Sequence, residues 1–432
     1  MNFSTTLWDV DLLIARILQL RCGLLGLLMA STLPFTPTCL QAGESGEAVK
    51  APQPKAVTIN YVAQPMVNPL GGEQQEFGWL QGLWLNLQLG TGSSKPLASW
   101  SELDHWVLKA RAAVVQGNGN YYRQIGAAYP LQTMTSAGQW ITEASLSRQP
   151  GRGNVGVKVG VLTLNPSFMD LEAFNFYTHS AINDTFNNEV VGLPIAPLAA
   201  LGGQINLGDP QSSAVGSLRL AAMAIPPNWF GRSTSSTPPA VQGSIGLLQW
   251  QSGRLAAQGR VRDPIRHQGQ LLPRQLPSPE LLLGGYWSQT ATVQPQQTGV
   301  PQGTNRGLYG AATLVVPRRW LPALDSRVWM AVSYGFDAQN NPAPSFAATG
   351  VLMQGVIQSR PLDVLGLGIA ATTFSGVLAP TLTPEAVVEL NYALKLSTAF
   401  GLRPFAQVVF NPGGTNLWQP IVAAGMSLSF QF

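Results

Sequence analysis

The sequence of 432 residues predicts an all-β fold, a transmembrane antiparallel β-barrel. Three observations lead to this prediction. The C-terminal segment alternates between apolar and small polar side chains, the chain has few charged residues but no long apolar run beyond its N-terminus, and turn signals recur at short intervals. A membrane-spanning helix needs about 20 consecutive apolar residues, whereas a spanning strand of about 10 residues needs only to alternate.

The N-terminus has the features of a secretory signal rather than of a folded element. Arg16 and Arg21 precede the apolar stretch Cys22–Leu33, and a small-residue cleavage site lies near Ala42. A membrane anchor is the alternative, which the short apolar stretch disfavours. Both cysteines fall in this segment, so the mature chain would have no thiol chemistry. The predicted organisation is a signal peptide over residues 1–42, a periplasmic or plug-like segment over 43–78 and an outer-membrane β-barrel over 79–432.

The charge content argues against an ordinary globular protein. Asp, Glu, Lys and Arg make up 11% of the chain, whereas globular proteins average about 25%. The formal net charge of +4 is spread along the sequence and does not form a stripe, which argues against a nucleic-acid partner. A chain of this length without a shift in composition fits one large closed barrel.

Turn signals divide the chain into short runs that are typical of an antiparallel meander. Clusters of Gly, Asn, Asp and Pro mark these turns at residues 90–92, 117–120, 150–154, 209–210, 295–303, 340–344 and 411–414. The Pro-rich stretches Pro226–Pro239 and Leu272–Pro279 cannot lie in central strands, because proline has no N–H to donate. We expect both stretches to be extracellular loops.

Alternation assigns the side chains of two runs to lipid or to a pore. In residues 106–115 the lipid-facing set would be Trp106, Leu108, Ala110, Ala112 and Val114. In residues 388–397 it would be Val388, Leu390, Tyr392, Leu394 and Leu396. The charged and amide side chains that these phases turn inward are Lys109, Arg111, Glu389, Asn391 and Lys395.

Two further runs predict an ion pair inside the barrel. Residues 140–148 place Trp140, Ala144 and Leu146 on the face opposite Glu143, Ser145 and Ser147. In residues 155–161 the four valines face outward and Lys158 faces inward. If these runs form a hairpin around Gly151, Glu143 and Lys158 come close across the strands. The alternative for each residue is an ordinary solvated strand face.

The segment Phe168–Asn188 is rich in aromatic and amide side chains with polar flanks. Two interpretations are open. Either it folds into the lumen and narrows it, or it is an ordinary outer loop.

The last eight residues suit a strand between lipid and water. Met426, Leu428, Phe430 and Phe432 share one face, opposite Ser427, Ser429 and Gln431. A soluble sandwich strand alternates in the same way. Outer-membrane barrels, however, commonly close on such a strand, with a final Phe that their assembly machinery reads. Outer-membrane lipid and the barrel assembly machinery are therefore predicted partners.

No pattern predicts catalysis or a metal site. His105, His179 and His267 lack metal-ligand spacing, and no cysteine supplements them. Gly366-Leu367-Gly368 lacks the strand–loop–helix context of a phosphate site. The sequence therefore predicts a protein that is not an enzyme and has no cofactor.

Three separated stretches resemble the carbohydrate-selective porin family of OprB type, including its cyanobacterial versions. The most specific stretch runs from Glu389-Leu390-Asn391-Tyr392 through Leu402–Gln407 and Asn411–Gly414 to the terminal strand. The others are Gln358–Gly368, with its Arg-Pro-x-Asp turn, and Thr142–Leu146 with Gly156–Gly160. They occur in the family's order, and the similarity covers about Gly71–Phe432.

The resemblance implies about 16 strands, usually in a homotrimer, in the outer membrane of a Gram-negative-type bacterium, with a channel for passive diffusion of small sugars. The candidates for lining or constricting this channel are Lys109, Arg111, Glu143, Lys158, Glu389, Asn391 and Lys395. Longer cyanobacterial relatives carry a surface-layer homology domain, for which residues 43–78 are too short. Two alternatives stay open: a general porin for ions and small nutrients that favours anions, and a barrel that serves as a receptor or adhesin without transport.

Overall fold

The structure is a computed structural model, and its described residues belong to one compact unit, Gln53–Phe432. It describes residues 57–90, 106–134, 137–148, 155–165, 167–183, 186, 190–208, 215–226, 230–233, 241–252, 264–292, 302–397 and 399–432. The predicted signal peptide over residues 1–42 lies outside this part of the chain. Among the described residues, no helix is both long and apolar enough to cross a membrane.

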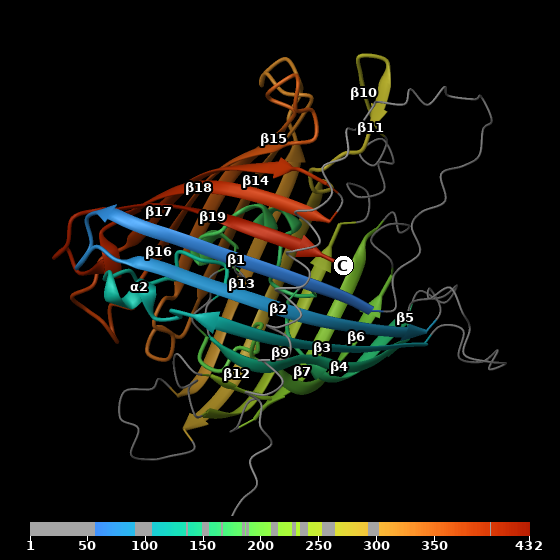
Figure 1. Cartoon of the computed structure of the whole chain (residues 1–432). Helices are drawn as coiled ribbons and strands as arrows, with labels where there is room; N and C mark the ends of the chain where they lie inside the picture. The colour runs from blue at the N-terminus through green and yellow to red at the C-terminus, as the bar shows by residue number, and fades with distance from the viewer. Residues whose placement is uncertain are drawn as a thin grey trace, which may run out of the picture. The chain divides into compact units, whose positions relative to one another are not determined.

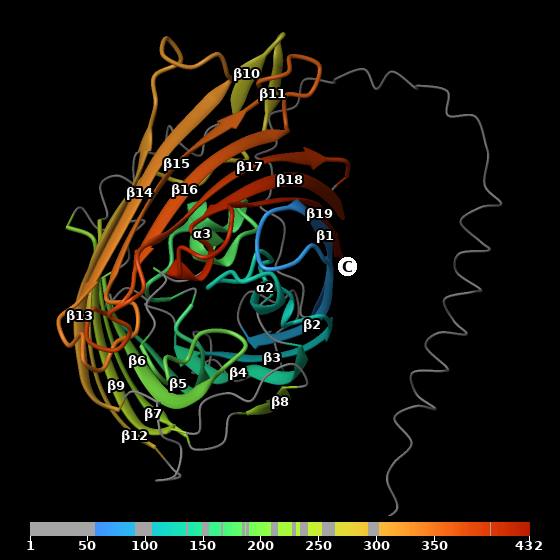
Figure 2. The ribbon, with the colours of Figure 1, turned by 90° about the vertical axis from the view of Figure 1, so that its left-hand side faces the viewer.

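The described strands close into an antiparallel barrel (Figures 1 and 2). The main sheet has 17 strands, and without the three-residue strand β8 (Gly231–Ser233), which pairs beside β4, 16 strands form the wall. The wall strands are β1 (Val57–Leu70), β2 (Phe77–Gly90), β3 (Trp106–Gly117), β4 (Gly138–Arg148), β5 (Val155–Leu162), β6 (Ala200–Leu207), β7 (Ser217–Ile225), β9 (Val241–Gln251), β12 (Glu280–Thr292), β13 (Gly303–Val315), β14 (Asp325–Gly335), β15 (Ser345–Gln354), β16 (Val364–Thr373), β17 (Glu385–Lys395), β18 (Phe400–Phe410) and β19 (Ile421–Gln431). The predicted fold class and strand number are confirmed.

The remaining described elements are short. They are the helices α2 (Tyr121–Gln124) and α3 (Ser180–Asn183), the 3₁₀ turns η2 (Glu172–Phe176) and η4 (Pro412–Gly414), and the hairpin of β10 (Ile265–His267) with β11 (Gln270–Leu272). None of them interrupts the wall.

The barrel closes where β1 pairs with β19. Ladder pairs run from Asn60 with Gln431 to Leu70 with Val422, and the N–H of Phe432 donates to the carbonyl of Ile59 at 2.9 Å. The other edge of β1 pairs with β2. Residues 57–78 are therefore wall strands with the turn between them, which corrects the expected start of the barrel at residue 79. Asn60, Gln64 and Pro65 interrupt the apolar alternation of β1, so its sequence does not show a clear strand pattern.

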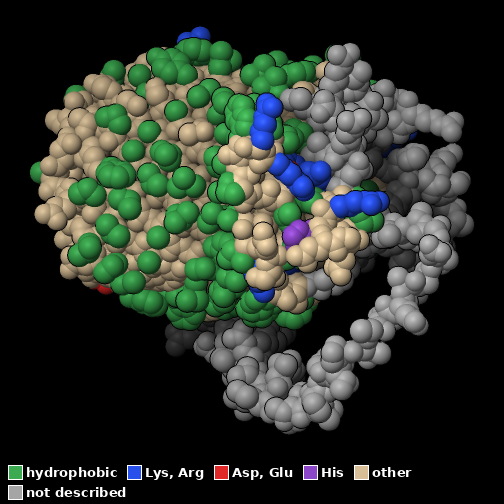
Figure 3. All heavy atoms as spheres, turned by 90° about the horizontal axis from the view of Figure 1, so that it is seen from above, with side chains coloured by type: hydrophobic (Ala, Val, Ile, Leu, Met, Phe, Trp, Pro, Cys, Tyr) green, Lys and Arg blue, Asp and Glu red, His purple; other side chains and the backbone are tan. Residues whose placement is uncertain are grey.

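The outer face of the wall is apolar at every second position. In β3, Leu108 and Val114 are exposed while Val107 and Val115 are buried, and in β5 Val155 and Val159 are exposed. Figure 3 shows hydrophobic side chains spread over the outer face, with Lys and Arg gathered towards one end. This is the pattern that lipid outside and a polar or packed interior require.

A β-bulge in β4 corrects one predicted phase. Arg111 of β3 pairs with Glu143, but the next residue, Ala112, pairs with Ile141, so Thr142 is an extra residue in the ladder. The consecutive residues Thr142 and Glu143 are therefore both buried. Trp140 points to the interior, where it is 3% exposed. The predicted lipid-facing position of Trp140 is wrong because a bulge shifts the period by one residue.

Connections alternate between the two ends of the barrel. We call the end at which β1 begins and β19 finishes the terminal end, and the opposite end the far end (Figure 1). The Pro226–Pro239 stretch joins β7 to β9 at the far end, whereas Leu272–Pro279 leads from β9 to β12 at the terminal end. The expectation that both stretches are extracellular is therefore wrong for one of them, because the two connections leave opposite ends of β9.

A charge on the lipid-facing side should destabilise the barrel according to its depth. Leu308 is 58% exposed near the middle of β13, and Val315 is exposed at its end. We expect Leu308→Arg to lower the free energy of unfolding in liposomes by roughly 2–4 kcal/mol and Val315→Arg by about 0–1 kcal/mol. Urea unfolding followed by tryptophan fluorescence measures both. Equal losses would contradict the assignment of this face to lipid.

Candidate functional site

The long connection between β5 and β6, residues 163–199, folds into the barrel; we call it the inward loop (Figure 2). It contains η2 and α3, and several of its apolar side chains are fully buried against the wall, namely Leu164, Phe168, Met169, Leu171, Phe174, Tyr177, Ile182 and Phe186. The predicted alternative in which residues 168–188 enter the lumen is confirmed for its described residues. An outer loop would leave these side chains in water.

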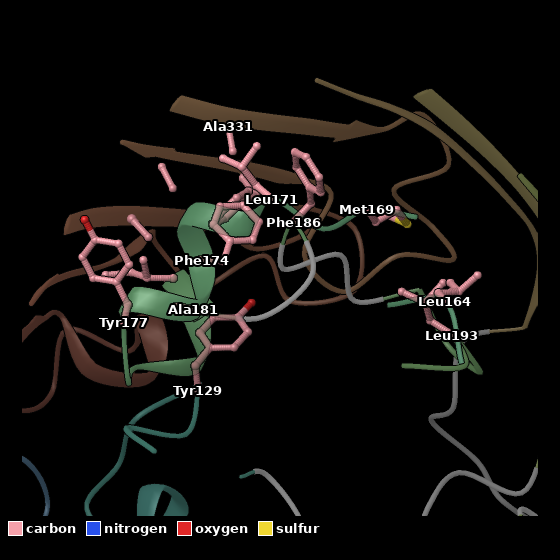
Figure 4. Close-up of a cluster of buried hydrophobic side chains, with 14 of the residues drawn as sticks. Tyr129, Leu164, Met169, Leu171, Phe174, Tyr177, Ala181, Phe186, Leu193 and Ala331 are labelled. Carbon is pink, nitrogen blue, oxygen red and sulfur yellow. The ribbon is translucent and has the colours of Figure 1, made fainter. Parts of the chain in front are cut away.

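Aromatic packing fixes one side of the inward loop to β13 and β14. Phe174 and Tyr177 each lie edge-on to the Trp329 ring, with ring centroids 5.4 Å apart. Phe186 lies 5.1 Å from the Tyr309 ring. Figure 4 shows Phe174 and Phe186 on the side of the loop that faces β14. Such pairs contribute about 0.5–1.5 kcal/mol each beyond the burial of area.

Two glycines of the wall form a socket for Tyr177. Gly350 and Gly368 are opposite each other on β15 and β16, and a Cβ on either would come within 2.6 Å of the Tyr177 side chain. The Tyr177 hydroxyl donates to the Leu367 carbonyl at 3.0 Å and accepts from Nε1 of Trp329 at 3.0 Å. Gly368, which the sequence offered only as part of a weak Gly-x-Gly pattern, thus has a packing role.

Glu389 holds the backbone of the inward loop. Its carboxylate accepts the N–H of Thr178 at 2.8 Å and the N–H of His179 at 2.6 Å. The side-chain amides of Asn391 and Gln407 donate to it at 2.8 and 3.0 Å. A carboxylate can accept about four such bonds, so the group is saturated.

The predicted exposure of Glu389 and Asn391 to the channel is therefore wrong. Glu389 is 0% exposed and Asn391 is 3% exposed, although both point inward as the alternation required. The reason is that the inward loop covers them. Alternation gives the face of a strand but not what lies against that face.

Other inward side chains hold loop backbone in the same way. Glu385 lies on the same face of β17, four residues before Glu389. Its carboxylate accepts the N–H groups of Ala128 and Gly413 at 2.9 and 2.6 Å. Gln249 of β9 accepts the N–H of Met169 at 3.0 Å. Each contact supplies a partner to a backbone group that has left the sheet, which a buried loop needs.

His179 lies in the covered part of the inward loop. Its Nδ1 accepts the N–H of Ala181 at 3.1 Å, and burial lowers the pKa of the imidazole to about 3, so the ring is neutral at neutral pH. Among the described residues, no group of three or more His, Cys, Asp or Glu side chains is placed to hold a metal ion.

A cavity of about 560 Å³ lies between the inward loop and the wall of β1–β4 and β17–β19. This volume is in the range of small-molecule sites. Its polar and charged lining residues are Gln64, Thr133, Thr142, Asn165, Asp170, Asn175, Asn183, Gln275, Lys395, Arg403, Ser427 and Ser429. Its aromatic lining residues are Trp84, Phe176 and Tyr177.

The remaining charged candidates form a cluster on the inner wall of β3–β5. Lys158 Nζ lies 2.7 Å from Glu143 Oε1, which also accepts from the Ser145 hydroxyl at 2.7 Å. The ion pair is thus present, although its strands place Ser147, and not Glu143, opposite Lys158. The lysine reaches diagonally past Gly160, which has no side chain.

Lys109 and Arg111 belong to the same cluster. Arg111 pairs with Glu143 in the ladder, and its Nε donates to Asn86 Oδ1 at 2.6 Å. Lys109 lies on the same face two residues earlier in β3. Whether this cluster narrows the channel stays a prediction, because none of its four charged residues lines the cavity beside the inward loop.

Of the seven predicted site residues, Lys395 alone lines this cavity, and sequence reasoning missed its other charged members. Arg403 was within reach of alternation, since in β18 it is two residues from Phe405, whose ring faces the interior. Asp170 and Asn175 had no such signal, because they lie on a loop without a period.

Comparison with known proteins gives the family. A model described as "Carbohydrate-selective porin, OprB family" matches residues 87–432. The chain is similar to the structure of Pseudomonas putida OprB at high pH, with a TM-score of 0.67 and 15% identity over 87% of this chain and 94% of that one. For the low-pH structure the TM-score is 0.50 and the identity 14%, over 87% and 92%. No curated protein matches the sequence.

Removal of the Glu389 carboxylate should release the inward loop. In Glu389→Ala the buried N–H groups of Thr178 and His179 would lose their acceptor, at about 1–3 kcal/mol each. We expect larger and noisier single-channel currents in planar bilayers, and a smaller change for Glu389→Gln, which keeps one acceptor oxygen. Glu73→Ala, at an exposed position of the far end, is the matched control. If the single-channel current of Glu389→Ala had the same size and noise as that of the wild type, this role would be contradicted.

Proposed function

This chain belongs to the carbohydrate-selective porin family of OprB type, an outer-membrane channel family without enzymatic activity, and we propose that small sugars cross it through the cavity beside the inward loop. The observation that supports this path most strongly is the lining of the cavity. Hydroxyl, amide and aromatic side chains face it together, and few of them carry charge.

The lining suits a solute made of hydroxyl groups and flat C–H faces. Asn175, Asn183 and Gln275 offer amide donors and acceptors, while Trp84 and Phe176 offer aromatic faces. A channel must bind its solute strongly enough for entry but weakly enough for release. Several separate hydrogen-bonding groups in a cavity open to water meet both needs.

We further propose distinct roles for the seven sequence-derived candidates. Lys109, Arg111, Glu143 and Lys158 form a polar wall beside the route, and Lys395 contacts the solute in the cavity. Glu389 and Asn391 act indirectly, since they hold the inward loop and so set the width of the cavity.

Assembly is also a proposal. We propose that the barrel forms a homotrimer and is inserted by the barrel assembly machinery, as the family implies. Support for the second point is that the apolar face of β19 includes exposed Met426 and ends at exposed Phe432. The signal peptide over residues 1–42 and a cyanobacterial source are retained as proposals on the sequence alone.

Liposome swelling tests the proposed function. Proteoliposomes should swell in isosmotic glucose faster than protein-free liposomes, and swelling should slow as the sugar grows from mono- to oligosaccharide. Glucose should also reduce the ion current of a single channel. A barrel that shows ion current without sugar uptake or sugar block would favour a general porin, and a barrel with neither would favour a receptor or adhesin.

Replacement of Glu143 and Lys158 should alter selectivity and spare the fold. Glu143→Ala should raise the anion-to-cation permeability ratio and Lys158→Ala should lower it, since each removes one charge from the same wall. The side chains of the pair are only 18% and 11% exposed, but removal of both partners leaves no unpaired charge behind, so the double variant should keep the heat-resistant gel mobility of the barrel. Reversal potentials in a salt gradient measure the ratio. Unchanged ratios in both single variants would remove the pair from the ion path.

A further inference from the structure

Two cations on neighbouring strands line the cavity beside the inward loop. Lys395, at the end of β17, pairs in the ladder with Gly401 of β18, and Arg403 follows two residues later on the same face. On its other side, β18 pairs Gly401 with Ser429 and Arg403 with Ser427. The small side chains around the two cations leave them facing the cavity, which both of them line together with Ser427 and Ser429.

Neither cation has a carboxylate partner among the described residues. Five other cations among the described residues do have a carboxylate partner. A side-chain nitrogen of each lies 2.6–2.9 Å from an Asp or Glu oxygen, and they are Lys158, Arg274, Arg306, Arg327 and Arg360. The contrast distinguishes Lys395 and Arg403 from the structural ion pairs of this barrel.

Arg403 is the less exposed of the two and is only partly hydrogen-bonded. Its Nη1 donates to the Tyr177 carbonyl at 3.3 Å, and its Nε has no partner although it is shielded from water. A guanidinium has five N–H donors in a planar fork that fits carboxylate and phosphate oxygens. Because Nε is shielded from water, an anion in the cavity would meet the guanidinium through its Nη groups, of which Nη1 already donates to Tyr177.

The nearest carboxylates form no ion pair with either cation, although the charge of Glu389 acts on Arg403 at longer range. Glu389 is covered by the inward loop and already accepts hydrogen bonds from two backbone N–H groups and two amides. Asp170 lines the cavity from the inward loop, and it takes part in an interaction of its own. Within the described lining of the cavity, two cations thus face one acid.

We propose that Lys395 and Arg403 form a subsite for the acidic group of a sugar, so that the channel prefers sugars bearing one carboxylate or phosphate over neutral sugars. This inference rests on the proposed function. The acidic group would lie between the Lys395 ammonium and the Arg403 guanidinium. Ser427, Ser429 and the amide side chains of the cavity remain available to the sugar hydroxyls.

The wall cluster supports the same preference at longer range. Lys109, Arg111 and Lys158 face Glu143, which leaves a positive surplus on the inner wall of β3–β5. A cleft lined by one sign of charge raises the local concentration of the oppositely charged solute. The surplus would draw acidic solutes into the barrel, and Lys395 with Arg403 would bind them.

Block of the single-channel current by glucose, glucuronate and glucose 6-phosphate tests the subsite, with acetate and inorganic phosphate as anions without a sugar. We expect the concentration for half-block to be about tenfold lower for at least one acidic sugar than for glucose, which corresponds to roughly 1.4 kcal/mol. The two acidic sugars distinguish a carboxylate from a phosphate as the preferred group.

The double variant Lys395→Gln/Arg403→Gln should abolish this difference, because the half-block concentrations of the acidic sugars should rise to that of glucose measured on the same variant. Lys395→Gln alone should reduce it; the one hydrogen bond of Lys395 to Asp363 comes from its backbone N–H, so the fold is spared. Arg319→Gln, which removes one positive charge from an exposed turn at the terminal end, is the matched control and should behave as wild type.

Three results would overturn the subsite. The first is equal block by glucose and both acidic sugars, which leaves the proposed sugar channel standing. The second is a preference that survives in the double variant. The third is block by acetate or inorganic phosphate as strong as that by the acidic sugars, which would make the subsite one for small anions. Absence of block by any sugar, together with absence of swelling, would instead reject the proposed function itself.

Discussion

The structure depends on one constraint: every backbone N–H and C=O inside the apolar layer needs a partner. The wall meets it by closure, since β1 pairs with β2 on one edge and with β19 on the other. The inward loop cannot use a ladder, and its backbone is bonded by wall side chains instead. Glu389 takes two N–H groups of the loop, and Gln249 takes a third. The inner wall therefore acts both as a lining and as a support.

This double use of the inner wall explains why its composition is uneven. Where the inward loop rests on β13–β17, the wall carries Trp329, Tyr309, buried glutamate and glycines that leave room for Tyr177. Where the cavity lies, it carries Ser427, Ser429, Gln64 and two cations that have no carboxylate partner in the described part of the chain. The inward loop thus divides the inner face of the wall into two parts. One part is packed against the loop, which we call the packed half, and the other borders the cavity, which we call the open half. In the proposed function, solutes pass through the open half, and contacts in the packed half hold the inward loop that borders it.

Charge is used differently in the two halves. The carboxylate of Glu389 is buried and saturated by donors, so it acts as a fixed anchor whose removal leaves orphaned N–H groups. Lys158 and Glu143 form an ion pair with 2.7 Å between Nζ and Oε1, in which each charge is neutralised by the other. Lys395 and Arg403 have neither arrangement, and on this difference we base the proposed subsite.

The sequence by itself determined the barrel, the lipid-facing side of most positions in the runs that could be phased, and the inward direction of Lys109, Arg111, Lys158 and Glu389, because a strand repeats every two residues whatever surrounds it. The sequence also predicted that Glu143 and Lys158 lie close to each other. Only the tertiary structure decided that a bulge at Thr142 turns Trp140 inward, that the inward loop covers Glu389, and that Arg403 joins Lys395 in a cavity. Register, coverage and enclosure depend on contacts between residues far apart in the chain, for which a local period has no signal.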